Sequence, residues 1–491
     1  MLKTNEKTRF IDSLKDNRKV WIEGDVVKDL SEHVAFKGTL ETIQNLFNQL
    51  DDEKIQQQIG FRSPKTGEYV HNAFLVPKTK EDLLARKEAF TRWATETLGN
   101  MSRLAESGRS YLTGWYASRE LFRQYDERFP EKITRIYEKA RDENRLVVSV
   151  VADPQVDRSK LQIEQEDPDL LLHVVKETEE GIIVRGAKVL ATAAPYAHDI
   201  IVQTSFKFNE DQEKYANLLI VEANSPGLHI ICRDTAASTN KVQYPLSSRF
   251  EEMDATVVFD DVLVPWDRVL LYKNPEGAYK ALIHKRDNSL ANQQSVIRLL
   301  ARLEFVAGLS FLITEAIAVN NYLNVQEKLG ELVIQIETIK AFLSAAEAEA
   351  KYDEFGTLWP EPLKLRIAID LGAKYYPRAI EILQQVAGGG FLQLPSVGLE
   401  QNEEIKAFID KYYRGANSPS ENKIDLFRLA WDLVGNPLGA RYELYERFFS
   451  GDPTRNYATR YKEYERTALT NRVTDFIQKL KVEAKKGDMN L

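Results

Sequence analysis

The stretch GIIVRGAKVLAT at residues 181–192 decides the fold, because five of its twelve residues are branched aliphatic. Such residues pack well on a pleated sheet and favour strands. Five similar runs lie between Leu146 and Tyr272, separated by segments rich in Gly, Pro and Asn. They are LVVSVV (146–151), DIIVQTSF (199–206), NLLIVEA (217–223), LHIICR (228–233) and ATVVFDDVLV (255–264). We predict a β domain over residues 146–276.

Helical patterns flank this β domain on both sides. Residues 30–50 and 79–101 place apolar residues three and four apart with charges between them, and one apolar stripe runs through residues 325–350. We predict an α+β, mainly α protein with three domains. These are an N-terminal helical domain (1–145), an antiparallel β barrel or sandwich (146–276) and a C-terminal helical bundle (277–491).

Composition excludes several classes of protein. The chain has 491 residues, of which 43% are hydrophobic, enough to bury several cores. Its formal charge of -8 argues against nucleic acid as a partner. The single cysteine, Cys232, forms no internal disulfide and cannot supply the thiolates of an iron–sulfur cluster or a cysteine zinc site. We expect no metal site and a reducing compartment.

Two kinds of signal are missing. No stretch reaches the ~20 consecutive apolar residues of a membrane span, and the first 20 residues are charged throughout, so we expect a cytoplasmic protein with no membrane partner. Neither GxGxxG after a strand nor GxxxxGK[ST] occurs. A redox enzyme of this sequence is not expected to bind NAD(P)H in the Rossmann manner.

Five stretches carry a family resemblance. They are SEHVAFKG (31–38), FLVPKTKEDLLARKEAFTRWA (74–94), SSRFEEMDATVVFDDVLVPWDRVLLY (247–272), LNVQEKLGELV (323–333) and ELYERFFSGDP (443–453). Nearly end to end, the chain resembles the 4-hydroxyphenylacetate 3-monooxygenase family, the oxygenase components of two-component flavin monooxygenases. The order of helices, β domain and bundle is also that of the acyl-CoA dehydrogenase fold.

The resemblance implies an activity and a set of partners. It implies a monooxygenase that receives FAD as FADH2 from a separate NAD(P)H:flavin reductase and uses O2. The flavin C4a-hydroperoxide would hydroxylate a phenolic or other electron-rich aromatic small molecule. It also implies a homo-oligomer, a homotetramer built as a dimer of dimers. The missing nicotinamide signature agrees with this division of labour.

The resemblance assigns flavin contacts at the start of the β domain. The family's Pro-Gln-x-x-Arg segment stands at residues 154–158, so Gln155 and Arg158 are expected to contact FAD. An amide can bond the ring edge, and a guanidinium can hold negative charge. Thr192, at the end of a strand, resembles the hydroxyl that bonds the flavin in the wider fold. The alternatives are a turn with a solvated arginine and an ordinary strand threonine.

A second flavin segment is expected in the bundle. Gln385, Gly388 and Gly389 in LQQVAGGGFLQLPS (383–396) look like the Gln and Gly-rich turn that reaches the FAD of a neighbouring subunit. The alternative is a helix C-cap, where glycine is preferred. If the first interpretation holds, the active enzyme is at least a dimer.

The substrate site departs from the family, which places an Arg, a Tyr and a His around the phenol. Without a gap, the family's GRSPDY falls on residues 102–107, which keeps Arg103 but puts Ser107 at the Tyr position. The His position is Ser149. A competing register uses Gly108-Arg109-Ser110 and shifts the following helix. Arg103 would orient the substrate's polar group, with Ser107 and Ser149 lining the pocket.

Serine is no base at neutral pH without a neighbour that takes its proton, so ordinary phenol activation is in doubt. One explanation is a substrate that is already acidic. A second is N-, S- or indole-type oxidation. A third is another residue as base: Glu106, unless it is a solvated helix carboxylate, or Tyr111, unless it only packs in the core. A non-catalytic flavin-fold ligand-binding protein is the remaining alternative.

Overall fold

The computed structural model describes residues 9–488, and its first part combines helices with four short strands. Strand β1 leaves this part and pairs in parallel with β10, at Lys19↔His229. Here the structure differs from the predicted helical domain, because the short run KVWI finds its strand partner far away along the chain. The elements are α1 (Arg9–Ser13), β1 (Lys19–Ile22), β2 (Asp25–Val26), α2 (Val34–Asn48), α3 (Gln56–Ile59), β3 (Gly60–Arg62), β4 (Tyr69–His71), η2 (Asn72–Phe74), α4 (Lys80–Glu96), α5 (Ala105–Ala117), α6 (Arg119–Phe122) and α7 (Phe129–Asp142).

The middle part contains two sheets, as the branched runs predict. The six-stranded sheet has the order β2-β1-β10-β11-β7-β6, and the four-stranded sheet has the order β12-β9-β8-β5. The prediction of antiparallel pairing holds for most pairs but is wrong for β5 with β8 and β1 with β10, which are parallel. The elements are β5 (Val147–Val150), η3 (Gln162–Glu164), β6 (His173–Glu177), β7 (Gly181–Thr192), η4 (Ala194–Tyr196), β8 (Asp199–Val202), η5 (Glu210–Tyr215), β9 (Leu218–Glu222), β10 (Leu228–Cys232), β11 (Asp254–Pro265), η6 (Trp266–Arg268) and β12 (Val269–Leu271).

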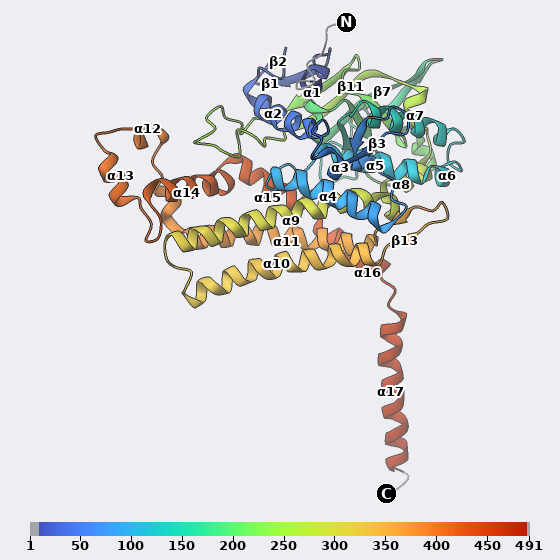
Figure 1. Cartoon of the computed structure of the whole chain (residues 1–491). Helices are drawn as coiled ribbons and strands as arrows, with labels where there is room; N and C mark the ends of the chain where they lie inside the picture. Colours follow the sequence, from blue (N-terminus) through green and yellow to red (C-terminus); the bar gives the residue numbers. More distant parts are fainter. Residues whose placement is uncertain (1–8, 489–491) are drawn as a thin grey trace.

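The last part is the predicted helical bundle, in which α9, α10 and α11 run side by side (Figure 1). Helices α8, α15 and α16 each begin with an Asn or Asp cap followed by Pro. The cap side chain accepts a hydrogen bond from a backbone N–H of the first turn, and proline suits the first helical position because it has no N–H that needs a partner. The elements are α8 (Pro275–Ile283), α9 (Lys285–Ala316), α10 (Leu323–Ala348), β13 (Lys351–Tyr352), β14 (Leu358–Trp359), α11 (Pro362–Ala387), η7 (Gly388–Gln393), α12 (Val397–Glu400), α13 (Lys406–Tyr412), α14 (Ser420–Val434), α15 (Pro437–Phe448), α16 (Pro453–Glu463) and α17 (Thr467–Asp488).

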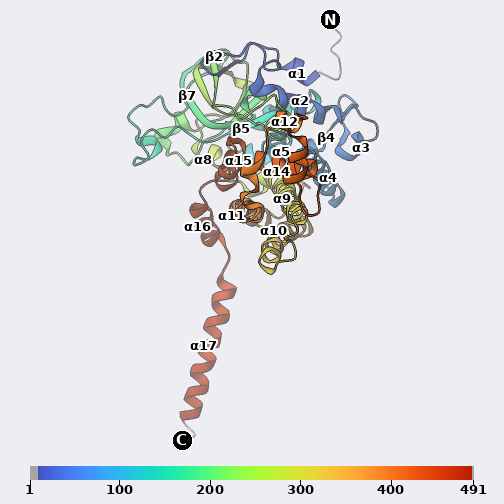
Figure 2. The ribbon, with the colours of Figure 1, turned by 90° about the vertical axis from the view of Figure 1, so that its left-hand side faces the viewer.

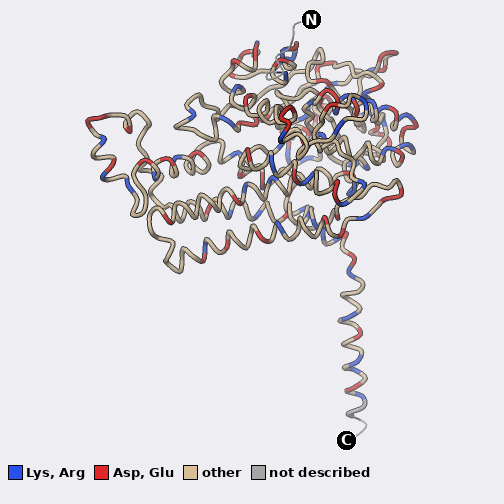
Figure 3. Tube along the Cα trace, viewed as in Figure 1, with Lys and Arg blue, Asp and Glu red and all other residues tan. Residues whose placement is uncertain are grey.

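Helix α17 projects away from the rest of the chain in both ribbon views (Figures 1 and 2). Its exposed apolar side chains include Leu469, Val473, Phe476, Ile477, Leu480 and Val482. Acidic and basic residues are interspersed along the chain, α17 included (Figure 3). Within residues 9–488, no helix is both long enough and apolar enough to cross a membrane.

Helix α5 lies between the β domain and the bundle, because two of its glycines allow close contact on both sides. A Cβ on Gly108 would lie 1.9 Å from the Val147 carbonyl oxygen of β5, and one on Gly114 would lie 2.4 Å from the Asp287 carbonyl oxygen of α9. The residues at the start of α5 are thereby held where the three parts of the chain meet.

We predict that Gly108→Ala lowers the stability of the protein. The new methyl group overlaps the backbone of β5, and such overpacking typically costs about 1–3 kcal/mol. The midpoint of thermal unfolding, followed by circular dichroism, should fall. Gly308→Ala in α9 is the matched control, since nothing lies within 4 Å of its Cβ and alanine is the better helix former. Equal midpoints for the two variants would contradict the close packing of α5 on β5.

Candidate active site

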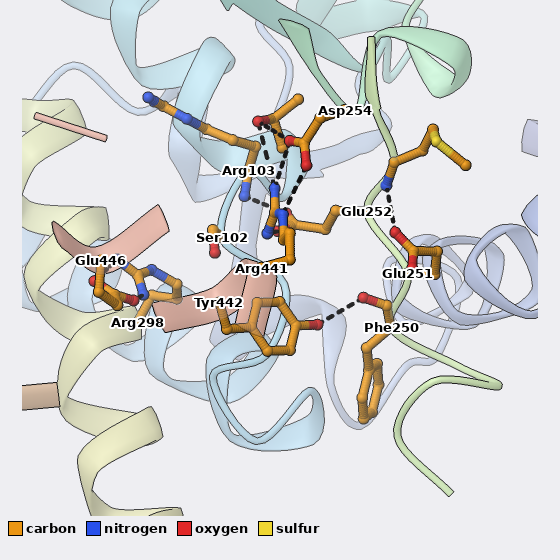
Figure 4. A network of polar contacts seen from close by, with 12 residues as sticks. Ser102, Arg103, Phe250, Glu251, Glu252, Asp254, Arg298, Arg441, Tyr442 and Glu446 are labelled. Atoms are coloured by element: carbon orange, nitrogen blue, oxygen red, sulfur yellow. Dashed lines mark hydrogen bonds and ion pairs between the residues drawn. The ribbon is translucent and has the colours of Figure 1, made fainter. Parts of the chain in front are cut away.

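Arg441 of α15 joins the three parts of the chain through a buried network (Figure 4). Its Nη1 donates to Glu252 Oε2 at 2.8 Å, and its Nε and Nη2 donate to the two carboxylate oxygens of Asp254 at 2.8 and 2.7 Å. Glu252 also accepts the backbone N–H of Arg103, and Asp254 accepts the Thr192 hydroxyl at 2.6 Å. Two residues predicted for the site, Arg103 and Thr192, therefore belong to one network.

The charges in this network stabilise one another. Burial alone raises the pKa of Asp254, but the Arg441 guanidinium and the Thr192 hydroxyl outweigh it and hold that pKa well below its usual range. Burial likewise lowers the pKa of Arg441, yet Asp254 and Glu252 raise it overall. Asp254 and Arg441 therefore both stay ionised, and their ion pair is a fixed part of the frame at neutral pH.

A second buried cluster fixes the turn before Arg103. Arg298 and Arg302 of α9 both bond Glu446 of α15, with Arg302 Nη1 at 2.7 Å from Glu446 Oε1, and the three side chains are at most 1% exposed. Arg302 also donates to the Gly99 carbonyl at 2.8 Å and to the Ser102 hydroxyl at 3.2 Å. Arg302 thus bonds the turn from the helical bundle, and Glu252 bonds it from the β domain.

The Arg103 guanidinium has hydrogen-bond donors that are not all used within residues 9–488. It donates from Nη1 to Ser107 Oγ at 3.3 Å, and it forms no ion pair within residues 9–488. Burial lowers its pKa, but Tyr445, Tyr111 and Glu252 together raise it. Arg103 is therefore a positively charged group with donors free for a ligand's oxygen atoms.

The two serines lie on facing elements. Ser107 is buried in α5, next to the glycine that touches Val147. Ser149 lies two residues beyond Val147 in β5 and accepts a hydrogen bond from Gln203 Nε2 at 2.9 Å. The structure therefore places both serines at the junction of α5 and β5. They offer hydrogen bonds and no base.

Glu106 is not the solvated carboxylate that one alternative describes. Its side chain is fully buried, and neither carboxylate oxygen has a hydrogen-bond partner. Burial raises the pKa of Glu106 to about 7, against the opposing effect of Arg109. This group therefore titrates near neutral pH. Tyr111 is partly buried, with its ring 6.3 Å from that of Trp115.

The segment after β5 presents the other predicted flavin residues. A nearly buried ion pair of 2.6 Å between Asp153 and Lys188 ties its start to β7. Gln155 and Arg158 beyond it are exposed, and neither has a hydrogen-bond or ion-pair partner in the described part of the chain. Their donors are free for a ligand such as a flavin. Thr192 is buried, and its hydroxyl donates a hydrogen bond to Asp254. Toward a ligand it can therefore only accept a hydrogen bond.

Gln385, Gly388 and Gly389 lie apart from this network, at the end of α11. Gln385 bonds Glu381 at 2.9 Å, one turn earlier. Gly388 caps the helix at φ 54° and ψ -142°, a conformation that favours glycine. A Cβ on Gly388 or Gly389 would meet nothing within 4 Å, so the turn faces open space. The C-cap interpretation holds for Gly388, and contact with a neighbouring subunit's flavin stays a prediction.

The partners of Arg103 were not predicted from the sequence. Glu252 and Asp254 lie in SSRFEEMD, and Arg441 and Glu446 lie in or beside ELYERFFSGDP, two of the stretches that carry the family resemblance. The sequence feature that could have indicated them is the group of acidic residues directly before a strand. Carboxylates at such a position need a cation from elsewhere in the fold.

We predict that Arg441→Gln destabilises the protein by about 3–5 kcal/mol, because it leaves the buried Glu252 without its cation and the largely buried Asp254 with only Arg233. The low pKa of Asp254 means that its ion pair stabilises the fold above about pH 4 and loses this effect as the pH falls toward the folded-state value. The loss should be largest at pH 7 and shrink below about pH 4.

Urea unfolding of wild type and variant across this pH range measures the effect. Arg447→Gln is the control on the same helix, since Arg447 is exposed and pairs only with Glu443. Its expected cost is about 0.5 kcal/mol or less. A pH-independent loss for Arg441→Gln would contradict the assigned role of the carboxylates.

Comparison with known proteins places this site in a family. The chain matches the family models described as 4-hydroxyphenylacetate 3-hydroxylase N terminal, over residues 6–271, and C terminal, over residues 286–478. The oxygenase component of 4-hydroxyphenylacetate 3-monooxygenase from Thermus thermophilus is 36% identical over 474 residues, 96% of each chain. A probable 4-hydroxyphenylacetate 3-monooxygenase from Bacillus subtilis is 34% identical and covers 95% of this chain and 97% of its own.

Solved structures agree. A crystal structure of a 4-hydroxyphenylacetate 3-monooxygenase oxygenase component with FAD and 4-hydroxyphenylacetate superposes with a TM-score of 0.92 at 35% identity, over 98% of this chain and 100% of that one. A 4-hydroxybutyryl-CoA dehydratase from N. maritimus, 19% identical with a TM-score of 0.85 over 96% of this chain and 94% of its own, shares the fold. The chain belongs to the 4-hydroxyphenylacetate 3-hydroxylase family.

Proposed function

We propose that this protein is the oxygenase component of a two-component monooxygenase, which uses FADH2 and O2 to hydroxylate a phenolic or other electron-rich aromatic molecule. One observation carries the proposal. The Arg103 guanidinium, free of any carboxylate within residues 9–488, is held between two buried ion-pair networks at the junction of α5, β5 and α15. A relative that superposes over the whole chain binds FAD and 4-hydroxyphenylacetate.

The residues divide the work between cofactor and substrate. Gln155, Arg158 and the Thr192 oxygen would hold FAD, and reduced FAD, when bound, supplies the electrons that activate O2. Arg103 would hold the substrate's oxygen. Ser107 and Ser149 would hydrogen-bond near it, and Glu106 is the group whose pKa suits the transfer of a proton near pH 7.

The names of the relatives favour a phenol as substrate. They include 4-hydroxyphenylacetate, 4-nitrophenol and a 3-chloro-4-hydroxyphenyl group. None of these names supports the alternative of N-, S- or indole-type oxidation, and their enzymatic activities argue against a purely ligand-binding protein. Hydroxylation of a phenol next to its OH is therefore the preferred reaction.

The proposal includes partners. A separate NAD(P)H:flavin reductase supplies FADH2, because the chain carries no nicotinamide-binding signature. A homo-oligomer, with a dimer of dimers as the preferred form, is supported by the uncovered apolar stripe of α17 and by the open turn at Gly388 and Gly389. Light scattering of the full chain measures this. We place the protein in the cytoplasm, where a single unpaired Cys232 is stable.

We predict that Arg158→Ala weakens the binding of reduced FAD by about 1.5–3 kcal/mol, the usual value of a hydrogen bond to a charged group. Anaerobic titration measures it, and the wild type should bind reduced FAD more tightly than oxidised FAD and oxidise no NADH by itself. Lys160→Ala is the control, since Lys160 already pairs with Asp157 and Glu166. Unchanged binding in Arg158→Ala would leave Arg158 a solvated turn residue.

We predict that the wild type hydroxylates 4-hydroxyphenylacetate with poor coupling, because Ser107 and Ser149 replace the family's Tyr and His. Most reduced flavin would then form hydrogen peroxide. Restoring both residues, as Ser107→Tyr with Ser149→His, should raise product per flavin, since general base assistance is typically worth about 10²–10⁴-fold. Product and peroxide are measured together with reduced FAD and O2. Efficient coupling by the wild type would show that another residue, Glu106 first, serves as the base.

A further inference from the structure

Tyr445 of α15 lies among three arginines of the candidate active site. Its ring centre is 4.9 Å from the guanidinium carbon of Arg441, 5.6 Å from that of Arg298 and 5.9 Å from that of Arg103. The ring stacks on Phe449 at 4.9 Å with 3° between the planes, which fixes its orientation. No role for Tyr445 follows from the sequence alone.

The hydroxyl of Tyr445 has no hydrogen-bond partner in the described part of the chain, and it is not among the fully buried polar atoms. Tyr442, three residues earlier on the same helix, is different. It is fully buried, and its hydroxyl donates to the Phe250 carbonyl at 2.7 Å. The Tyr442 hydroxyl is therefore occupied by a hydrogen bond within the fold, whereas the Tyr445 hydroxyl is open to a ligand.

Arg103 and Tyr445 have unused donors and, unlike Arg298 and Arg441, no carboxylate bonded to the side chain within residues 9–488. Arg298 is paired with Glu446, and Arg441 with Glu252 and Asp254. Burial raises the pKa of Tyr445, although Arg103 and Arg298 oppose it. The phenol of Tyr445 thus keeps its proton at neutral pH and acts as a donor, not as a base.

We propose that Tyr445 donates a hydrogen bond to the phenol oxygen of the substrate, next to Arg103, and so stabilises the phenolate form. This inference rests on the proposed position of the phenol at Arg103. The substrate's O–H proton leaves to water or a base, and Tyr445 keeps its own proton. A tyrosine from α15 would then supply the phenolic hydroxyl that position 107 of α5 lacks.

Tyr111 is the competing tyrosine, since it lies one turn after Ser107 in α5 and also contributes to the charge state of Arg103. Its ring belongs to the apolar cluster around Trp115 and makes no cation–π contact within residues 9–488, whereas the Tyr445 ring has three arginines of this site beside it. The observations therefore favour Tyr445, and a variant of each tyrosine separates the two.

The test is the pKa of bound 4-nitrophenol, whose ionised form is coloured, measured on the full chain with oxidised FAD present. Tyr445→Phe keeps the ring and its stacking on Phe449 and removes only the hydroxyl. We expect it to raise the pKa of the bound phenol by about one unit, the value of one hydrogen bond to a charged oxygen. Tyr442→Phe, the matched control on α15, should cost stability and leave this pKa unchanged.

The other outcomes contradict either the role of Tyr445 or the proposed position of the phenol. An unchanged pKa in Tyr445→Phe, or a shift only in Tyr111→Phe, rejects the role of Tyr445. Arg103→Lys tests the site itself: if it leaves binding and pKa of 4-nitrophenol unchanged, or if the wild type binds no 4-nitrophenol, the proposed phenol position fails. Failure of Tyr445→Phe alone, with an effect of Arg103→Lys, rejects only this inference.

Discussion

Neutralising two carboxylates, the buried Glu252 and the largely buried Asp254, is the constraint on which the rest of the structure depends. Both carboxylates lie where the β domain meets the N-terminal helices. The cation that pairs with both of them is Arg441 of α15. A charge removed from water without a partner costs several kcal/mol, so the three parts of the chain must assemble together. The relative position of the domains thus follows from electrostatics as well as from apolar packing.

This constraint also explains the contrast within the site. The backbone around Arg103 is bonded from the β side by Glu252 and from the bundle side by Arg302, so it is rigid. The side chains of Gln155 and Arg158 are exposed and have no hydrogen-bond or ion-pair partner within residues 9–488. The proposed substrate anchor is thus held in place by the fold, whereas the proposed cofactor residues Gln155 and Arg158 are not. Rigid placement of the group that touches the reacting molecule is the usual requirement for catalysis.

Much of the fold follows from local sequence. The branched runs become β5, β7, β8, β9, β10 and β11, and the stripe over residues 325–350 becomes α10, because each pattern matches the period of its element. Strand β1 was missed because its pairing with β10 is nonlocal. The same reason hid Arg441, whose partners lie 187 and 189 residues away. For Glu106 the sequence leaves a base and a solvated carboxylate both open, because helical charge usually faces water, and only the fold shows that it is buried.

The chain order of the Arg441 network has a consequence for biosynthesis. Arg103 is translated first, then Glu252 and Asp254, and Arg441 only after the long helices of the bundle. Until α15 emerges from the ribosome, Glu252 lacks the arginine that it pairs with in the folded chain, and Asp254 can pair only with Arg233, so both carboxylates favour hydration. The Arg441 network is therefore completed late in folding, and a nascent chain stalled before residue 441 would hold Arg103 and Thr192 without their frame.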